Sequence, residues 1–124
     1  MSFDWSEYLH LAQELTGQAV TPPSQEAKLR SAISRAYYAA FCLARNHLLD
    51  KGYPVPTDGR AHKYVPQKFK SRPDLSHRQI GENLDRLRED RRKADYDNVV
   101  SGLPSKTRMA IKLAKQAIST LGNL

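Results

Sequence analysis

Polar side chains interrupt the apolar pattern of the sequence at two places, and both carry groups that could do chemistry. In the first, Arg35 and Tyr38 are three residues apart, so on a helix they share a face. In the second, Arg91 precedes Asp95 by one helical turn and can pair with it, and Tyr96 follows directly. Facing one cleft, such arginines would bind phosphate oxygens, and such tyrosines would stack on or hydrogen-bond to a base. The alternative is an ion-pair network that only fixes the helix register.

His62 has the most reactive setting of the four histidines, because it stands between Arg60 and Lys63. Nearby positive charges favour the neutral ring, which could then act as a general base. The alternative is an ordinary histidine at a helix start or on the surface. No two histidines have HxxxH or HExxH spacing, and Cys42 is the one cysteine. We therefore expect no metal, no cofactor and no internal disulfide, and a buried, inert thiol at Cys42.

The positive charge of the chain is concentrated in two segments. There are 20 Lys and Arg against 13 Asp and Glu, a net charge of +7, and residues 60–73 and 98–124 contain no acid. The first segment holds five bases, which are Arg60, Lys63, Lys68, Lys70 and Arg72. Clustered bases attract phosphate backbones or acidic partners. The alternative is a solvated surface whose charge only maintains solubility.

Apolar residues that recur every three or four positions indicate the helices that would position these groups. The pattern predicts helices over 3–17, 24–51 and 74–96, a short helix over 60–70, and a last helix that begins near Pro104. Pro66 is expected to confine the short helix or to split it into turns. On the first helix, one buried face is expected to hold Trp5, Tyr8, Leu9, Ala12 and Leu15. On the helix over 74–96, one stripe is formed by Ile80, Leu84, Leu87, Arg91 and Ala94.

These segments predict an all-α fold, an up-and-down antiparallel bundle of four to five helices in a single domain over 1–124. No segment alternates with the period of a strand, and 124 residues leave no room for a second core. The length excludes a Rossmann or barrel enzyme with a complete cofactor site. No stretch approaches the ~18 apolar residues of a membrane span. The N-terminus lacks the pattern of a signal peptide, so we expect a soluble cytoplasmic protein that does not enter the membrane.

Two motifs in the chain resemble those of HEPN domains, the higher eukaryotes and prokaryotes nucleotide-binding family. Residues 30–41, Arg-Ser-Ala-Ile-Ser-Arg-Ala-Tyr-Tyr-Ala-Ala-Phe, are similar to the second-helix signature of the family. The run Leu87-x-x-x-Arg91-x-x-Ala94-Asp95-Tyr96 resembles the late-helix signature of a small prokaryotic branch. His62, followed at a distance by Phe69, resembles that branch's inter-motif segment. The resemblance covers roughly residues 24–97.

The resemblance implies a helical bundle, commonly a homodimer with a cleft between protomers, and often a small nucleotidyltransferase partner encoded next to it. Many HEPN proteins are metal-independent RNases or toxins, whose motif arginine is followed after four to six residues by a histidine. Arg91 matches that arginine, but Asp95 and Tyr96 stand where the histidine is expected. Arg72 and His77 have the same spacing, but Pro73 places them across a loop. The family also contains tyrosines that such a partner adenylylates, and Tyr96 is the candidate here.

The residues therefore lead to one main hypothesis and two alternatives. The main one is an RNA- or nucleotide-associated interaction module without RNase activity, one component of a prokaryotic toxin–antitoxin or nucleotidyltransferase-linked gene pair. The first alternative is a metal-independent endoribonuclease toxin, with Arg91, Asp95, Tyr96 and His62 as candidate catalytic residues. An arginine stays protonated and a paired aspartate is a weak base, which disfavours that enzyme. The second alternative is a structural assembly subunit, in which Arg35 and Asp95 only lock helices together.

Overall fold

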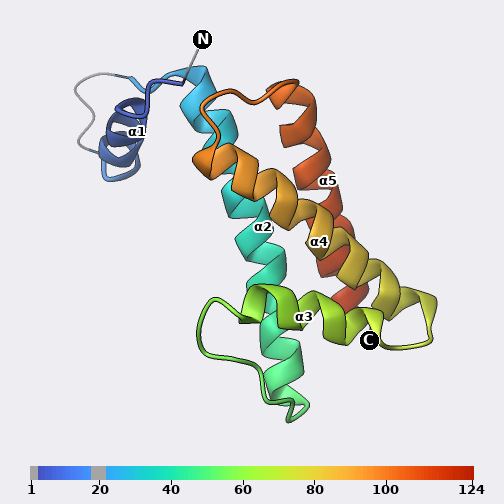
Figure 1. Cartoon of the computed structure of the whole chain (residues 1–124). Coiled ribbons are helices and arrows are strands. Elements are labelled where there is room, and N and C mark those ends of the chain that lie inside the picture. Colours follow the sequence, from blue (N-terminus) through green and yellow to red (C-terminus); the bar gives the residue numbers. More distant parts are fainter. Residues whose placement is uncertain (1–2, 18–21) are drawn as a thin grey trace.

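Five α-helices make up most of residues 3–17 and 22–124, the part of the chain that the computed structural model describes (Figure 1). Their bounds are α1 Glu7–Leu15, α2 Gln25–Asp50, α3 Ala61–Lys70, α4 Leu75–Tyr96 and α5 Leu103–Gly122. The predicted all-α bundle is confirmed, and the bounds of α2 and α4 lie within one residue of those predicted. Among these described helices, none is long and apolar enough to cross a bilayer.

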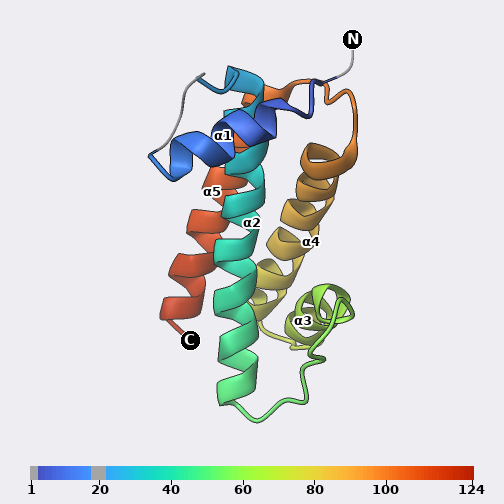
Figure 2. The same cartoon turned by 90° about the vertical axis from the view of Figure 1, so that its left-hand side faces the viewer.

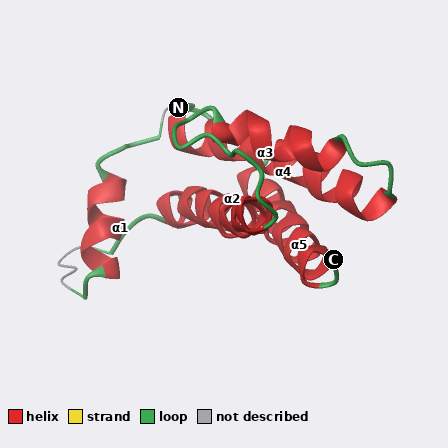
Figure 3. Ribbon diagram, turned by 90° about the horizontal axis from the view of Figure 1, so that it is seen from below, coloured by secondary structure: helices red, strands yellow, loops and turns green. Residues whose placement is uncertain are grey.

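The three long helices form the body of the bundle (Figure 2). α4 runs antiparallel to both α2 and α5, and each of the three packs against the other two. α3 departs from the up-and-down pattern, because it lies across the C-terminal half of α2 and packs on α4 (Figures 1 and 3). α1 packs beside the N-terminal part of α2. The N-terminal half of α2 is thus flanked by α1 and its C-terminal half by α3.

The core is built from the stripes that helical periodicity predicts. All five stripe residues of α4 are buried, including the one charged member, Arg91. On α2, the buried apolar residues are Ala27, Ile33, Tyr37, Ala40, Phe41, Ala44 and Leu48. α2 begins where Ser24 accepts a hydrogen bond from the backbone N–H of Ala27 at 3.2 Å, which satisfies an otherwise free donor of the first turn.

The first helix is shorter than predicted and buries a different face. α1 begins at Glu7, and Leu9 and Leu15 are 60% and 65% exposed, whereas Leu11 is buried. The predicted face is therefore wrong in part. Phe3 also lies outside the helix, and its N–H donates to Asn98 O at 2.7 Å. Its ring then lies edge-on to Trp5, with ring centres 4.9 Å apart.

Pro66 neither confines nor splits α3, which runs unbroken from Ala61 to Lys70. A proline inside a helix removes one backbone hydrogen bond, so other contacts must hold this segment helical. Val65 and Phe69 are buried, and their burial supplies that compensation. α3 packs closely on α4 at Gly81, where an added Cβ would lie only 2.6 Å from Pro66 O. Tight packing on α4 thus overrides the local effect of the proline.

Candidate functional site

Arg91 is a buried arginine in the middle of the bundle. Its guanidinium carbon lies 5.3 Å from the ring centre of Tyr37 and 5.6 Å from that of Tyr38, within reach of cation–π attraction. Nη1 donates to Asp95 Oδ2 at 3.5 Å, so the pair expected from the four-residue spacing is present. Nε is buried and has no partner in the structure. Arg91 thus keeps unused hydrogen-bonding capacity for an acceptor.

Asp95, which pairs with Arg91, also lines a groove on the surface. Ser34 Oγ donates to Asp95 Oδ2 at 3.4 Å, the carboxylate oxygen that Arg91 also contacts. The groove has a volume of about 330 Å³, and apolar residues of α1 form its other wall. Its polar lining comes from Ser31, Ser34, Arg35, Tyr38 and Asp95. The structure therefore brings together Arg35, Tyr38 and Asp95, with Arg91 directly behind Asp95.

His62 stands on the other side of Tyr38, at the start of α3. Its ring stacks on Phe41 with centres 4.6 Å apart, and its Nδ1 lies 2.6 Å from the Tyr37 hydroxyl. Burial lowers the pKa of the His62 ring, and the charges of Arg91 and Arg88 lower it further. His62 is thus neutral near pH 7, as the sequence suggests. The cause differs from the expected one, because the charges come from α4 and not from its neighbours in sequence.

The contact between His62 and Tyr37 decides which ring nitrogen carries the proton. Burial raises the pKa of the Tyr37 phenol above its usual value, so the phenol keeps its proton. An imidazole nitrogen is a better acceptor than a phenol oxygen, and we assign the hydrogen bond as Tyr37 donating to Nδ1. The proton of the neutral ring is then on Nε2. In this form His62 offers a donor at Nε2 and no free basic nitrogen.

Arg88 and Tyr37 also belong to the cluster around Arg91 and His62, although neither is among the site residues predicted from the sequence. Arg88 lies three residues before Arg91, on the same face of α4, and its buried Nε has no partner in the structure. The three-residue spacing from Arg91 is a pattern from which Arg88 could have been predicted as a site residue. The ring of Tyr37 lies in the apolar core, but its hydroxyl reaches His62. No local pattern indicates a contact between residues on two different helices.

Tyr96 lies away from the groove. It is 72% exposed and lines a separate shallow hollow together with Glu89 and Arg92. Asp95 and Tyr96 are adjacent on a helix, so their side chains point about 100° apart. The structure thus separates Tyr96 from the other predicted site residues and leaves its hydroxyl accessible to a macromolecular partner.

The basic surface predicted over 60–72 is partly neutralised by acids. Arg60 Nη2 pairs with Asp58 at 2.9 Å, and Lys70 pairs with Asp85 of α4. Lys68 is half-buried, and its Nζ lies 5.3 Å from the ring centre of Tyr53. Lys63 and Arg72 are exposed. The segment therefore presents less free positive charge than its sequence suggests.

The arginine that locks helices together is Arg30, and not Arg35 as one alternative expected. Arg35 is exposed, whereas Arg30 is fully buried. Arg30 donates to three backbone carbonyls at the end of α4, those of Ala94 at 2.9 Å, Asp97 at 2.7 Å and Asn98 at 3.3 Å. Its guanidinium also covers the ring of Phe3 at 4.3 Å, and its Nε donates to Glu26 at 3.0 Å. This contact ties the N-terminal segment to α2 and α4.

Across residues 3–17 and 22–124, no three side chains of His, Cys, Asp or Glu gather closely enough to hold a metal ion. Cys42 is a free, half-buried thiol within these residues. The chemistry that the described site offers is therefore that of guanidinium, hydroxyl, carboxylate and aromatic groups.

The fold is an all-helical bundle, with buried arginines beside a groove that Tyr8 and Tyr38 help to line. A family model for the HEPN domain matches residues 23–124, and the chain belongs to this family of nucleotide- and RNA-associated modules. HEPN domains commonly dimerise. Neither the search of curated proteins nor the search of solved structures found a significant match.

The lowered pKa of His62 predicts how stability depends on pH. Below the ordinary histidine pKa of about 6.5, the unfolded chain binds a proton that folded His62 resists, so acid favours unfolding. The contribution of His62 is complete above about pH 6.5 and is lost as the pH falls towards its lowered folded pKa. His47, whose pKa burial and Lys51 also lower, acts in the same direction. We expect His62→Gln to lose less stability than the parent between about pH 7.5 and about pH 5.5. Urea unfolding at both pH values measures this, and equal losses in the two proteins would contradict it.

Proposed function

We propose that this HEPN domain is an interaction module that binds single-stranded RNA or a nucleotide in the groove between α1 and α2 without cleaving it. The observation that carries the proposal is the placement of Arg35, Tyr38 and Asp95 on one groove, with the incompletely bonded Arg91 behind it. A nucleotide presents an aromatic face, ribose hydroxyls and a charged phosphate. The groove offers a matching group for each of them.

Each polar residue of the groove has a distinct role in this proposal. Tyr38, which is 37% exposed, offers its ring as a platform for a base. Arg35 is exposed at the rim, where its guanidinium can pair with a phosphate through two hydrogen bonds. Asp95 accepts hydrogen bonds from ribose hydroxyls, while Arg91 and Ser34 hold its carboxylate in place. The 2′-hydroxyl would then favour RNA over DNA.

The proton positions assigned at the cluster support the proposal that the RNA is not cleaved. Cleavage through the 2′-hydroxyl needs a base to remove its proton and an acid to protonate the leaving oxygen. His62 is the histidine beside Arg91, and its Nδ1 accepts from Tyr37. A neutral imidazole with its proton on Nε2 and Nδ1 occupied is neither a base nor an effective acid. It is suited to donating a hydrogen bond to a phosphate oxygen.

Binding to a fluorescein-labelled single-stranded RNA, followed by anisotropy at low salt, tests the site. We expect Tyr38→Ala to weaken binding about tenfold, because stacking on one base contributes about 1–3 kcal/mol. Arg35→Ala should weaken binding and reduce the slope of log K against log salt by about 1, because one phosphate contact is lost. The matched control is Arg86→Ala, which removes an exposed arginine of α4 outside the groove. Equal affinities for all four proteins would show that the groove is not the site, and no binding at all would favour a purely structural subunit.

Incubation of micromolar protein with cellular RNA in EDTA tests the absence of cleavage. We expect the RNA to stay intact, because the Asp95 carboxylate is engaged by Arg91 and Ser34, and His62 has no free basic nitrogen. RNA cleavage that is lost in Arg91→Lys would instead establish the metal-independent endoribonuclease. The lysine variant keeps the buried charge, so a loss of activity would not simply reflect unfolding.

The same proposal includes the setting in which the module acts. We propose that the protein is a cytoplasmic homodimer and one component of a prokaryotic toxin–antitoxin or nucleotidyltransferase-linked pair. The family supports this, because HEPN domains commonly dimerise, and the exposed Leu43 and Leu49 of α2 offer apolar area for contact. Light scattering would measure the dimer. A neighbouring reading frame for a small nucleotidyltransferase, and co-purification of its product, would establish the pair.

A further inference from the structure

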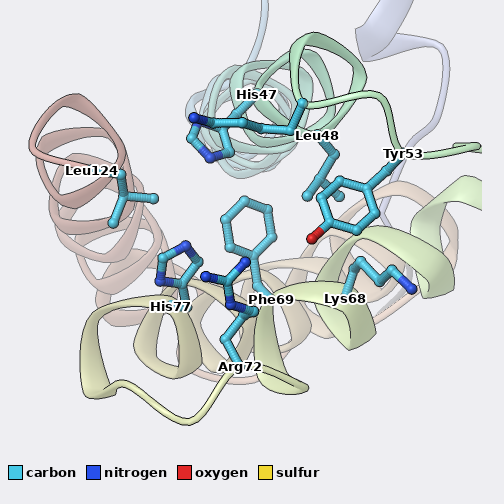
Figure 4. A pocket seen from close by; sticks show the side chains of 9 residues that line it. His47, Leu48, Tyr53, Lys68, Phe69, Arg72, His77 and Leu124 are labelled. Atoms are coloured by element: carbon cyan, nitrogen blue, oxygen red, sulfur yellow. The ribbon is translucent and has the colours of Figure 1, made fainter.

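A second cavity lies at the other end of α2, far along the helix from the Asp95 groove. Its volume is about 510 Å³, within the range of roughly 300–1,000 Å³ that is usual for small-molecule pockets. The last turns of α2, the loop that follows, α3 and the start of α4 all contribute to its lining (Figure 4). None of the residues that line it belongs to the groove described above.

Aromatic rings form the inner wall of this cavity. Phe69 is its floor, at 1% exposed, and the rings of His47 and His77 lie with their centres 5.8 and 5.9 Å from the Phe69 ring. The half-buried Tyr53 closes one side. Figure 4 shows His47, His77 and Phe69 around one shared space. The partly exposed histidine and tyrosine rings suit a flat ligand group, because aromatic side chains and histidines stack on bases.

Basic side chains also line the cavity. Lys51, Lys68 and Arg72 line it, and no aspartate or glutamate side chain does so among the described residues. Among the acids near the cavity, Asp74 is engaged with His77, since its Oδ2 lies 2.5 Å from His77 Nδ1, and Asp50 lies close enough to His47 to act on its pKa. The Arg72 side chain extends from the end of α3 towards the ring wall (Figure 4). Three cations beside an aromatic wall fit a ligand that joins a flat ring to an anion.

We propose that this cavity is a second binding site, which takes one nucleotide unit with a terminal phosphate. The base lies against the half-buried rings of His47, Tyr53 and His77, which cover the buried Phe69, and the phosphate is bound by Arg72 and Lys51. Arginine suits this role, because its planar group bonds two phosphate oxygens at once. Inorganic phosphate would leave the ring wall unused, and a nucleoside would leave the three charges unused. The same chemistry is found in a free nucleoside monophosphate and in the 5′-phosphorylated end of an RNA.

Calorimetric titration of the full chain with AMP tests the site. We expect saturable binding of AMP, with adenosine and inorganic phosphate each at least about tenfold weaker, since a charged hydrogen bond contributes about 1.5–3 kcal/mol. Arg72→Ala should weaken AMP binding by a similar factor for the same reason. The control is Arg78→Ala, an exposed arginine of α4 that does not line the cavity. Absence of saturable AMP binding, or equal losses in the two variants, would overturn the proposal.

Two further measurements separate this site from the groove and identify the source of the ligand. AMP should shift the backbone amide resonances of Phe69 and His77, and this shift should persist in Arg35→Ala and Tyr38→Ala, because those two changes alter only the groove, whose occupancy Ser34 and Asp95 report. Shifts confined to Ser34 and Asp95 would place AMP in the groove and overturn this proposal alone. An RNA with a 5′-phosphate that binds more tightly than its 5′-hydroxyl counterpart, with the difference lost in Arg72→Ala, identifies an RNA end. An equal affinity of the two RNAs, with AMP still bound, identifies a free nucleotide.

Discussion

Replacing Arg30 by methionine is expected to lower the free energy of unfolding by about 3 kcal/mol, the loss typical of disrupting a buried charged network. Arg30 is fully buried, and the change removes its hydrogen bonds to the carbonyls of Ala94, Asp97 and Asn98. A carbonyl left without a donor costs about 1–3 kcal/mol, and this applies first to Asp97 O, since Asn98 O keeps the Phe3 N–H and Ala94 O keeps the Tyr8 hydroxyl. The guanidinium above Phe3 is lost as well, which loosens the N-terminal segment. Urea denaturation followed by circular dichroism measures the change.

Arg35→Met is the matched control for this prediction. It makes the same chemical change five residues later on the same helix, at an exposed position. Surface substitutions usually change stability by less than about 0.5 kcal/mol, so this variant should unfold like the parent. Arg30→Lys should fall between the two, because one ammonium cannot reach three carbonyls in different directions. Similar losses at both arginines, or none at Arg30, would contradict the locking role.

These two arginines show what could be predicted from the sequence. Arg30 lies three residues before Ile33 and seven before Tyr37, so it falls on the buried stripe of α2, whereas Arg35 does not. The periodicity that predicts the helices therefore also predicts that Arg30 is buried. Its partners could not be predicted, because Ala94 and Asp97 lie 64 and 67 residues further along the chain. Only the packing of α4 on α2 brings those carbonyls to it.

In the candidate site too, contacts within one helix could be predicted from the sequence, and contacts between helices could not. The pair of Arg91 and Asp95 lies within one helical turn, and its spacing alone predicts it. The contact between Tyr37 and His62 joins two helices, and it depends on where α3 crosses α2. That crossing results from tertiary packing that overrides Pro66, which no local rule anticipates. Long-range contacts of this kind decide whether His62 is a base or a donor.

Because α3 packs closely on α4 at Gly81, we expect Gly81→Ala to lower the free energy of unfolding. A Cβ added at Gly81 would lie 2.6 Å from Pro66 O and 2.5 Å from Lys70 Cγ. The lysine side chain can move aside, but the backbone oxygen cannot do so unless α3 shifts. Overpacking of a core contact lowers the free energy of unfolding by about 1–3 kcal/mol. The higher helix propensity of alanine raises it by about 1 kcal/mol. We expect a net loss of up to about 2 kcal/mol in the free energy of unfolding.

The expected consequence at the site distinguishes this prediction from a general loss of stability. If α3 moves off α4, His62 separates from Tyr37, its ring gains solvent, and its lowered pKa rises towards the ordinary histidine value. Nitrogen-15 NMR titration of the histidine side chains measures that rise, and urea unfolding measures the stability. Gly122→Ala is the control, because Gly122 is also helical and an added Cβ there meets nothing within 4 Å. Equal stability of the two alanine variants, with an unchanged His62 titration, would show that Gly81 does not set the position of α3. A rise in the His62 pKa in Gly81→Ala alone would show that the packing of α3 controls the protonation of the cluster around Arg91.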